Sequence, residues 1–422
     1  MYQHQLTTLK NGLRLLTIPM KSVESMTVMI GFGAGSRYET KQTNGLSHFL
    51  EHMLFKGTTK RPNTLAIMST LDGIGAEVNG GTEKEYTIYY VKANAVHQPL
   101  AFDVLADMVL NSKLEEKEIQ REKGVIIEEL NMYEDIPMQK ITEVFESLLY
   151  SPTPLGWYVG GMKENIRSIQ KEDFLSYQKR LYFPANMVVV KAGKVDQKEA
   201  LSLTEKYFGH LKPQDKEEFQ PLTFQQKAPR VRLRQKKTNQ THFCLGVRGY
   251  ANSHPDRYAL SILATILGQG MSSRIFTQVR ERRGLAYYVR THRAFYLDNG
   301  YLMTQAGVDI NKIDETIKVI LEEYWRVVNE KVKTKELQKA KEFQKGRLVL
   351  SLEDSGEVAE RYALQAILKK EIDDPQQSLA KIDKVEAADV QKVAKDIFNP
   401  EKLNLAIIGP YNDEERFLKL FK

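Results

Sequence analysis

Residues 44–57 read NGLSHFLEHMLFKG, and the spacing of their apolar side chains predicts a helix. Asn44 is suited to cap the start of this helix, and Gly57 is suited to end it. His48 and His52 are four residues apart, so their imidazole rings lie on one helical face about one turn apart. Because two imidazoles so placed can bind one tetrahedral zinc ion, the stretch predicts a metal site.

Glu51 lies three residues after His48 and beside His52, at the edge of the same helical face. From that position its carboxylate can hydrogen-bond a zinc-bound water and accept its proton. The alternative is a chance spacing on a solvated helix. In a chain with 8 histidines, the pattern His-x-x-Glu-His arises by chance in about one sequence in a hundred, which favours the metal site.

A catalytic zinc needs a third protein ligand and one open position. The helical stretch 118–137, EIQREKGVIIEELNMYEDIP, offers Glu122 and Glu129, which are seven residues apart and can both point at the metal. Glu128 lies about 100° around the helix from Glu129 and is predicted to be a solvated neighbour. Since carboxylates are common on helices, the spacing alone leaves a charged surface face as the alternative.

Strand patterns surround the predicted metal helix on both sides. The first is a hairpin with Asn11 and Gly12 at its turn. The other strands expected in this half of the chain alternate or are wholly apolar, and they cover residues 25–33, 85–93 and 186–193. A polar segment with three prolines, residues 212–230, follows and is predicted to be a linker.

The order of elements restarts after this segment, with strands over residues 231–235, 241–249, 285–296, 301–308 and 403–409. We therefore expect an α+β fold made of two tandem, structurally similar domains, each a mostly antiparallel sheet with helices packed on one face. The predicted domains are a zinc-binding domain over residues 1–211 and a second domain over residues 231–422, joined by the linker.

The composition is that of an ordinary globular protein, because 42% of the 422 residues are hydrophobic and 27% are charged. The net charge of +7 is spread along the chain without long runs of one sign, so nucleic-acid binding is not expected. The single cysteine, Cys244, fits a reducing compartment. No signal-peptide pattern and no membrane-spanning apolar run is evident, so we expect a cytoplasmic location without membrane contact.

Several motifs along the chain resemble those of the pitrilysin/insulysin family of inverted-motif zinc metallopeptidases. HFLEH is followed by EEL 77 residues after the second histidine. Further matches are GSRYE, REKGVIIEEL, LYFPANMVVVKAG and GQGMSSRIFTQVRERRGLAYYV. The likeness is greatest to the short branch, which contains mitochondrial processing peptidase subunits and bacterial relatives. The resemblance therefore implies that this chain has the fold and the activity of a zinc metalloendopeptidase.

The resemblance implies one zinc ion per chain, bound by His48, His52 and Glu129, with Glu51 as the general base. Glu122 matches a second family glutamate and is implied to orient His52 or the ligand sphere.

In the second half, the resemblance implies that Tyr287 donates a hydrogen bond to the oxyanion and that Arg280 holds a substrate carbonyl. The family binds peptide as an extra strand at a sheet edge, which here implies substrate binding at Asn79, Gly80 and Gly81. The family more often has Ala-x-Thr-Ser after the asparagine, whereas this chain has Gly80-Gly81-Thr82-Glu83.

In the family, a closed chamber built from four domains admits unstructured peptides. This chain has two predicted domains, so the resemblance implies a homodimer in which Arg280 and Tyr287 act in trans. The alternative is a non-catalytic or partner-dependent subunit of a heterodimeric processing peptidase.

Overall fold

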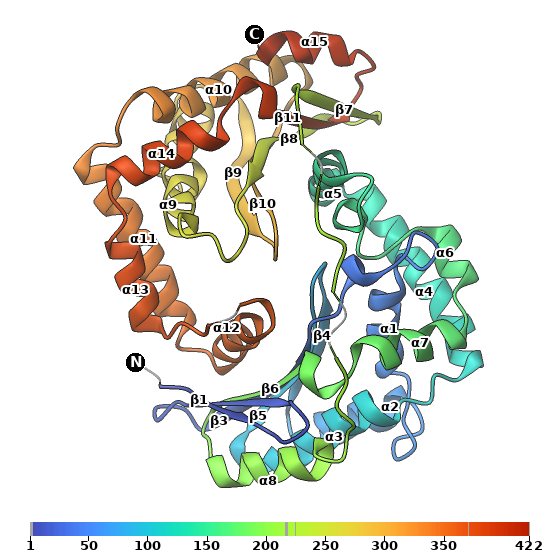
Figure 1. Cartoon of the computed structure of the whole chain (residues 1–422). Coiled ribbons are helices and arrows are strands. Elements are labelled where there is room, and N and C mark those ends of the chain that lie inside the picture. The colour runs from blue at the N-terminus through green and yellow to red at the C-terminus, as the bar shows by residue number, and fades with distance from the viewer. Residues whose placement is uncertain (1–2, 216–217, 224, 370, 422) are drawn as a thin grey trace. The chain divides into compact units, whose positions relative to one another are not determined.

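The computed structural model describes residues 3–215, 218–223, 225–369 and 371–421, and these form two compact units (Figure 1). The first unit consists of Met1–Asn131, Tyr158–Gln220 and Val349–Gln376. The second unit consists of Met132–Trp157, Pro221–Leu348 and Gln377–Lys422.

The first unit contains a six-stranded sheet that is antiparallel except where β2 pairs with β6. Across the sheet the strands are β1 (Gln5–Thr8), β2 (Arg14–Pro19), β6 (Met187–Gly193), β3 (Ser25–Phe32), β5 (Thr87–Asn94) and β4 (Glu77–Thr82). The helices are α1 (Leu46–Leu54), α2 (Thr64–Asp72), α3 (Gln98–Asn111), α4 (Glu116–Asp135), α6 (Lys163–Ser168), α7 (Lys171–Leu181), α8 (Gln197–Phe208) and α12 (Ser355–Leu368). Strand β4 is therefore an edge of this sheet.

The inner strands β3 and β6 of the first sheet are buried on both faces, and β3 shows how the two faces differ. Val28 and Ile30 join the main core, to which α1, α3 and α8 contribute their apolar side chains. The alternate position Thr27 faces α12, because its hydroxyl lies 2.9 Å from that of Ser355 on this helix. A Cβ atom on Gly31 would lie only 2.8 Å from Ile367, so the glycine allows α12 to pack closely.

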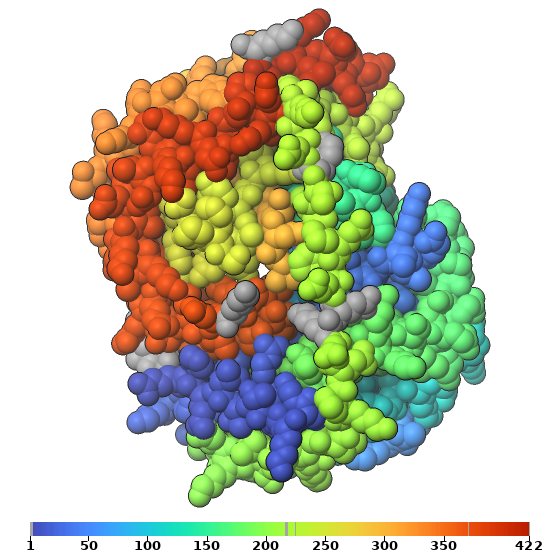
Figure 2. Space-filling view, viewed as in Figure 1, coloured from blue at the N-terminus to red at the C-terminus, as the bar shows by residue number. Residues whose placement is uncertain are grey.

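The second unit contains a five-stranded sheet that is antiparallel except where β7 pairs with β11. Across it the strands are β7 (Arg230–Gln235), β11 (Asn404–Gly409), β8 (Gln240–Gly249), β10 (Gly300–Asp309) and β9 (Ala286–Phe295). The helices are α5 (Pro137–Tyr150), α9 (Arg257–Gly268), α10 (Ile313–Asn329), α11 (Thr334–Ser351), α13 (Pro375–Asp383), α14 (Ala387–Ile397) and α15 (Glu414–Leu418). The outer face of α14 lies at the surface of this unit (Figure 2).

The second sheet also carries a single helix on one face. Phe145 and Leu149 of α5 pack against Cys244, Met303 and strand β11. Helices α9, α10 and α14 form the larger core on the opposite face.

The two sheets share one topology, which agrees with the prediction of two structurally similar domains. When the edge strand β1 is set aside, the first sheet has the order β2-β6-β3-β5-β4 and the second has the order β7-β11-β8-β10-β9. In both, the first of the five strands lies beside the last, followed by the second, fourth and third. The predicted α+β class with two similar, mostly antiparallel sheets is confirmed.

The compact units are discontinuous in sequence, whereas the sequence analysis predicts continuous domains over residues 1–211 and 231–422. Helix α5 comes from the first half of the chain and packs in the second unit, and α12 does the reverse. The described residues of the predicted linker contain no helix or strand before β7, while residues 216–217 and 224 lie outside the description. No helix in the described part of the chain is long and apolar enough to cross a membrane.

Candidate metal centre

The amide groups at the start of helix α1 are bound by a buried carboxylate, that of Glu39, and not by the predicted cap, Asn44. Glu39 accepts hydrogen bonds from the Gly45 and Ser47 amides and from the Ser47 hydroxyl, at 2.9, 2.7 and 2.6 Å. The prediction that Asn44 caps α1 is wrong, because its side chain instead donates to Glu39 and to the carbonyl of Tyr158. A carboxylate suits the start of a helix because the first amide groups are unpaired and the helix dipole is positive there.

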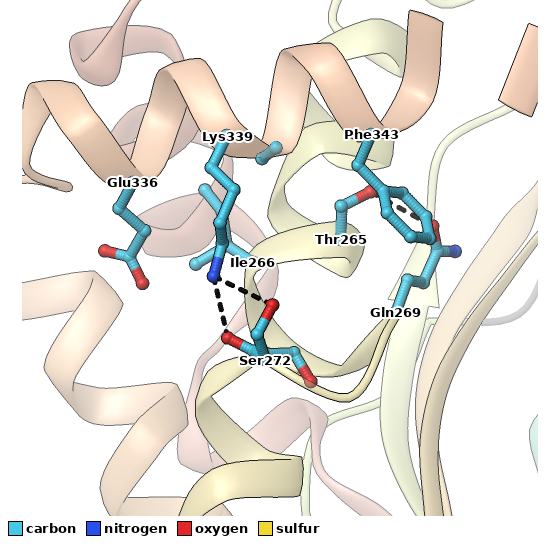
Figure 3. Close-up of a pocket in the computed structure, with 9 residues that line it drawn as sticks. Thr265, Ile266, Gln269, Ser272, Glu336, Lys339 and Phe343 are labelled. Carbon is cyan, nitrogen blue, oxygen red and sulfur yellow. Dashed lines mark hydrogen bonds between the residues drawn. The ribbon is translucent and has the colours of Figure 1, made fainter. Parts of the chain in front are cut away.

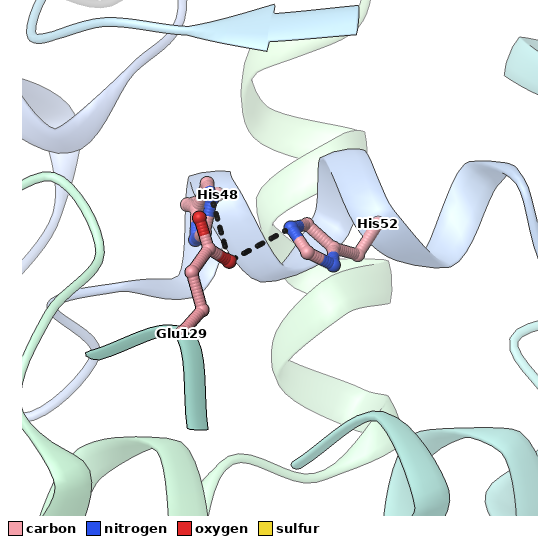
Figure 4. Close-up of side chains that lie close together, drawn as sticks. All are labelled: His48, His52 and Glu129. Atoms are coloured by element: carbon pink, nitrogen blue, oxygen red, sulfur yellow. Dashed lines mark ion pairs between the residues drawn. The ribbon is translucent and has the colours of Figure 1, made fainter. Parts of the chain in front are cut away.

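The two histidines of α1 lie close together beside a carboxylate of α4 (Figure 4). Their ring centroids are 4.6 Å apart. Glu129 Oε2 is 3.8 Å from His48 Nε2 and 3.5 Å from His52 Nε2. The expected third ligand, 77 residues along the chain, is therefore at the histidine pair.

These three side chains fit a zinc ion. One ligand atom from each lies within 4.8 Å of the others. Ligands on a tetrahedral zinc are about 3.3–3.5 Å apart, so a small inward movement of the side chains suffices. Burial, and secondarily the neighbouring His52, lowers the pKa of His48 to about 3. The His48 imidazole is therefore neutral at physiological pH, the state in which it can bind a metal.

Glu122 contacts the ring nitrogen of His52 that does not face Glu129. Its Oε1 is 2.9 Å from His52 Nδ1, and its Oε2 is 2.6 Å from the ammonium group of Lys56. Burial of Glu122 opposes its ionisation, but the hydrogen bonds from His52 and Lys56 together lower its pKa. With Nδ1 engaged by Glu122, the Nε2 atom of His52 presents its lone pair toward Glu129. Glu122 thus lies behind the ligand sphere, and Glu128 is exposed to solvent.

Glu51 is held on the opposite side by strand β4. The Thr82 hydroxyl donates to Glu51 Oε2 at 2.6 Å. Burial raises the pKa of Glu51, and the Glu129 carboxylate adds to this rise, while the hydrogen bond from Thr82 opposes it. A raised pKa makes this carboxylate a better proton acceptor near neutral pH.

The predicted substrate residues lie on β4, the open edge of the first sheet. Asn79 is exposed, and its Oδ1 accepts the amide of Gly80 at 2.9 Å. Gly80 adjoins the metal site, because a Cβ atom there would lie 3.0 Å from Glu51 Cγ. Gly81 pairs with Ile88 of β5.

Arg280 and Tyr287 belong to the second unit. Arg280 is exposed in the π-helical turn η5 (Phe276–Glu281), with its guanidinium 5.2 Å from the centroid of the Phe276 ring. Tyr287 is 59% exposed and sits at a bulge in β9, where the pairing with β10 skips a residue. Both irregularities turn a side chain outward, and both are frequent next to functional sites.

A small pocket of about 40 Å³ also lies in the second unit, where the glycine segment 268–270 passes α11 (Figure 3). Lys339 donates to the carbonyl and hydroxyl oxygens of Ser272, at 2.8 and 3.1 Å. Gln344 donates to Thr265 and Gln269. Because these polar groups bind one another, their hydrogen bonds hold the glycine segment against α11.

Three residues beside the predicted site, Lys56, Thr82 and Glu39, were not predicted from the sequence. Lys56 follows His52 by one helical turn, a spacing that could have indicated it. Thr82 lies in the predicted substrate strand, and Glu39 lies in the GSRYE motif, but neither position indicates a contact with α1.

Comparison with known proteins supports the resemblance along the whole chain. Residues 14–160 match a family model described as insulinase, peptidase family M16, and residues 168–343 match one described as the peptidase M16 inactive domain. An uncharacterized zinc protease of Streptomyces coelicolor is 35% identical over 97% of this chain and 90% of its own. One of Bacillus subtilis is 34% identical over 96% of this chain and 97% of its own.

A probable mitochondrial-processing peptidase subunit beta of Schizosaccharomyces pombe is 31% identical over 96% of this chain and 90% of its own. Among solved structures, a protease from Helicobacter pylori has the same fold, with a TM-score of 0.91 and 24% identity over 97% of this chain and 100% of that chain. From the two family models and these relatives, the chain belongs to the insulinase family of peptidases, peptidase family M16.

Proposed function

We propose that this chain is a zinc-dependent endopeptidase that hydrolyses unstructured peptides. The observation that carries the proposal is the convergence of His48, His52 and Glu129 within 4.8 Å, with the carboxylate of Glu51 on the same helix. Relatives named zinc proteases support the same reading.

His48, His52 and Glu129 would hold the zinc ion, which when bound supplies a Lewis acid that polarises the scissile carbonyl and makes water more acidic. Glu51 takes a proton from the attacking water and passes it to the leaving amine. Glu122 keeps His52 in the tautomer whose Nε2 is free.

The open edge of β4 is the proposed substrate strand. An extended peptide can pair with Asn79, Gly80 and Gly81 as an added strand, which selects unfolded segments because only these present free backbone groups. The two glycines let the peptide backbone approach closely.

We further propose a homodimer in which Arg280 and Tyr287 serve the partner's metal site. The phenol of Tyr287 would donate a hydrogen bond to the developing oxyanion, and Arg280 would hold a substrate carbonyl. The exposure of both side chains supports this role.

The first experiment measures zinc content and cleavage of a quenched, unstructured peptide by the purified chain, with and without a chelator. We expect one zinc ion per chain and cleavage that the chelator abolishes and added zinc restores. A chain without zinc would contradict the proposal.

Two glutamine variants test the role of Glu51. Glu51→Gln is expected to keep its zinc and lose cleavage by about 10²–10⁴-fold, because it cannot accept a proton. The matched control, Glu128→Gln, changes an exposed carboxylate beside Glu129 and is expected to keep full activity. Full activity of Glu51→Gln would remove Glu51 as the base.

The second candidate function is a partner-dependent subunit, which the relative named a mitochondrial-processing peptidase subunit beta favours. Mixing inactive Glu51→Gln with inactive Tyr287→Phe separates the two. Partial recovery of cleavage is expected from a homodimer with a site shared in trans. Zinc binding without cleavage by the wild-type chain would favour the partner-dependent subunit.

A further inference from the structure

Thr82 of β4 contacts the side chain of Glu51 through its hydroxyl. The bond joins Thr82 Oγ1 to Glu51 Oε2 at 2.6 Å and links two elements that are 31 residues apart in the chain. A hydroxyl bonded to a carboxylate at this distance forms a strong, charge-assisted hydrogen bond. One oxygen of Glu51 is therefore fixed.

Gly80 of the same strand and Tyr89 of β5 also lie near Glu51. A Cβ atom on Gly80 would lie 3.0 Å from Glu51 Cγ and 3.3 Å from Oε1, so the carboxylate uses the space that this glycine leaves. The same Cβ atom would lie 3.2 Å from the ring of Tyr89, which is fully buried and hydrogen-bonded to the phenol of Tyr182 at 3.1 Å. Glu51 thus rests against a rigid part of the sheet.

Gly80 and Thr82 also present their backbone to the open edge of β4. The Glu83 amide donates to the Tyr86 carbonyl, and hydrogen-bonded pairs alternate along an antiparallel ladder. The bonded pairs are then Gly81 with Ile88 and Asn79 with Tyr90, which leaves the backbone groups of Gly80 and Thr82 facing outward. The bond from the Gly80 amide to the Asn79 side chain agrees with this direction.

We propose that Thr82 is a positioning residue that orients the carboxylate of Glu51 from the strand on which the peptide docks. The inference rests on the proposed endopeptidase function. Because Thr82 belongs to the strand on which the peptide docks and gives its hydroxyl to the base, a peptide paired with β4 lies in a set register relative to Glu51. Removing the hydroxyl takes away the side-chain hydrogen bond that orients the carboxylate and leaves the zinc ligands unchanged.

The test compares three variants in the zinc-loaded chain. Thr82→Val keeps the shape of the side chain and loses the hydroxyl, and we expect kcat to fall about 10- to 100-fold with KM and the zinc dissociation constant within about twofold of wild type. Thr82→Ser restores the hydroxyl and is expected to recover most of kcat. Thr87→Val, on the paired position of β5, loses a hydroxyl bonded to the Ala34 carbonyl and serves as the structural control.

A double-mutant cycle shows whether Thr82 acts through Glu51. In the Glu51→Gln background, Thr82→Val is expected to cause no further loss of residual cleavage and no change in the dissociation constant of the peptide. Equal kcat for wild type and Thr82→Val, or an undiminished loss in the Glu51→Gln background, would overturn the inference while the proposed function stands. Absence of cleavage by the zinc-loaded wild-type chain would instead overturn the proposed function, and this inference with it.

Discussion

At the scale of single residues, the charge on Glu122 depends on two partners. Its side chain is only 2% exposed, yet one oxygen meets His52 and the other meets Lys56. An ionised carboxylate can stay buried only when it is paired in this way. Glu122 therefore links the cation of Lys56 to the imidazole that faces Glu129.

Glu122→Gln keeps the size of the side chain but removes its charge. We expect zinc to bind about 10- to 100-fold more weakly, because a neutral amide oxygen replaces the charged acceptor that orients the His52 imidazole and raises its basicity. Competition with a chelator of known affinity measures the change. Glu118→Gln, one turn earlier on the same helix and paired with Arg121, is the control and should bind zinc like wild type. Unchanged affinity in Glu122→Gln would contradict the role given to this residue.

At the scale of elements, α1 is fixed at its start by Glu39 and just beyond its end by two aspartates of α3. Arg61 pairs with Asp103 and Asp107, each through one nitrogen, at 2.7 and 2.9 Å. These contacts hold the loop that follows the metal helix, so the helix is anchored at both ends.

Glu39→Ala leaves buried donors at the start of α1 without an acceptor. We expect the free energy of unfolding to fall by about 2–4 kcal/mol, which combines a lost helix cap with unpaired buried amides. Urea unfolding of the metal-free chain measures this. Glu24→Ala, which removes a surface ion pair with Lys194, should change stability by less than about 1 kcal/mol. Similar losses in the two variants would show that Glu39 is not the anchor.

Asp103 makes the anchor sensitive to acid. Burial opposes its ionisation, but hydrogen bonds from Lys60, Arg61 and Tyr207 outweigh burial and lower its pKa from 3.8 to about 2. A carboxyl with a lowered pKa stabilises the fold above its unfolded pKa, and this contribution is lost as the pH falls from 3.8 to about 2.

The corresponding prediction concerns the difference between wild type and Asp103→Asn. The variant is expected to have a lower free energy of unfolding than wild type near neutral pH. The difference between the two free energies should narrow as the pH falls from about 4.5 to about 2.5. Urea midpoints across this range measure the gap. A gap that widens toward acid pH would show that the lowered pKa is not the cause.

At the scale of the whole molecule, each sheet depends on a helix from the other half of the chain. Helix α12 covers Gly31 and neighbouring residues of the first sheet, and α5 covers the face of the second sheet that includes Cys244. A half-chain without its helix would expose an apolar sheet face to water.

A chain divided between Gln220 and Pro221 tests this dependence. We expect the fragments 1–220 and 221–422 to aggregate or remain unfolded when each is made alone. Co-expressed, they should associate and bind zinc, because each supplies the helix that the other lacks. Circular dichroism and size-exclusion chromatography distinguish these outcomes. A folded, zinc-binding fragment 1–220 would show that α12 is dispensable.

The local features of the site could be predicted because they depend on short spacings. His48, Glu51 and His52 are placed by the helical period, and the strand patterns predicted two similar, mostly antiparallel sheets. Glu129 and Glu122 were equivalent by spacing, and the family resemblance distinguished them. The start of α1 was predicted incorrectly, because Asn44 has the chemistry of a cap but Glu39 reaches the same amides from outside the helix.

The sequence by itself therefore determined the family, the class of two similar α+β domains and the helix that carries His48, Glu51 and His52, because periodicity and short motifs are properties of neighbouring residues. The tertiary structure alone decided that Lys56 pairs with Glu122, that Thr82 holds Glu51, and that α5 and α12 pack in opposite halves. These contacts join residues far apart in the chain, and their partners are selected by burial and close packing, which no local pattern records.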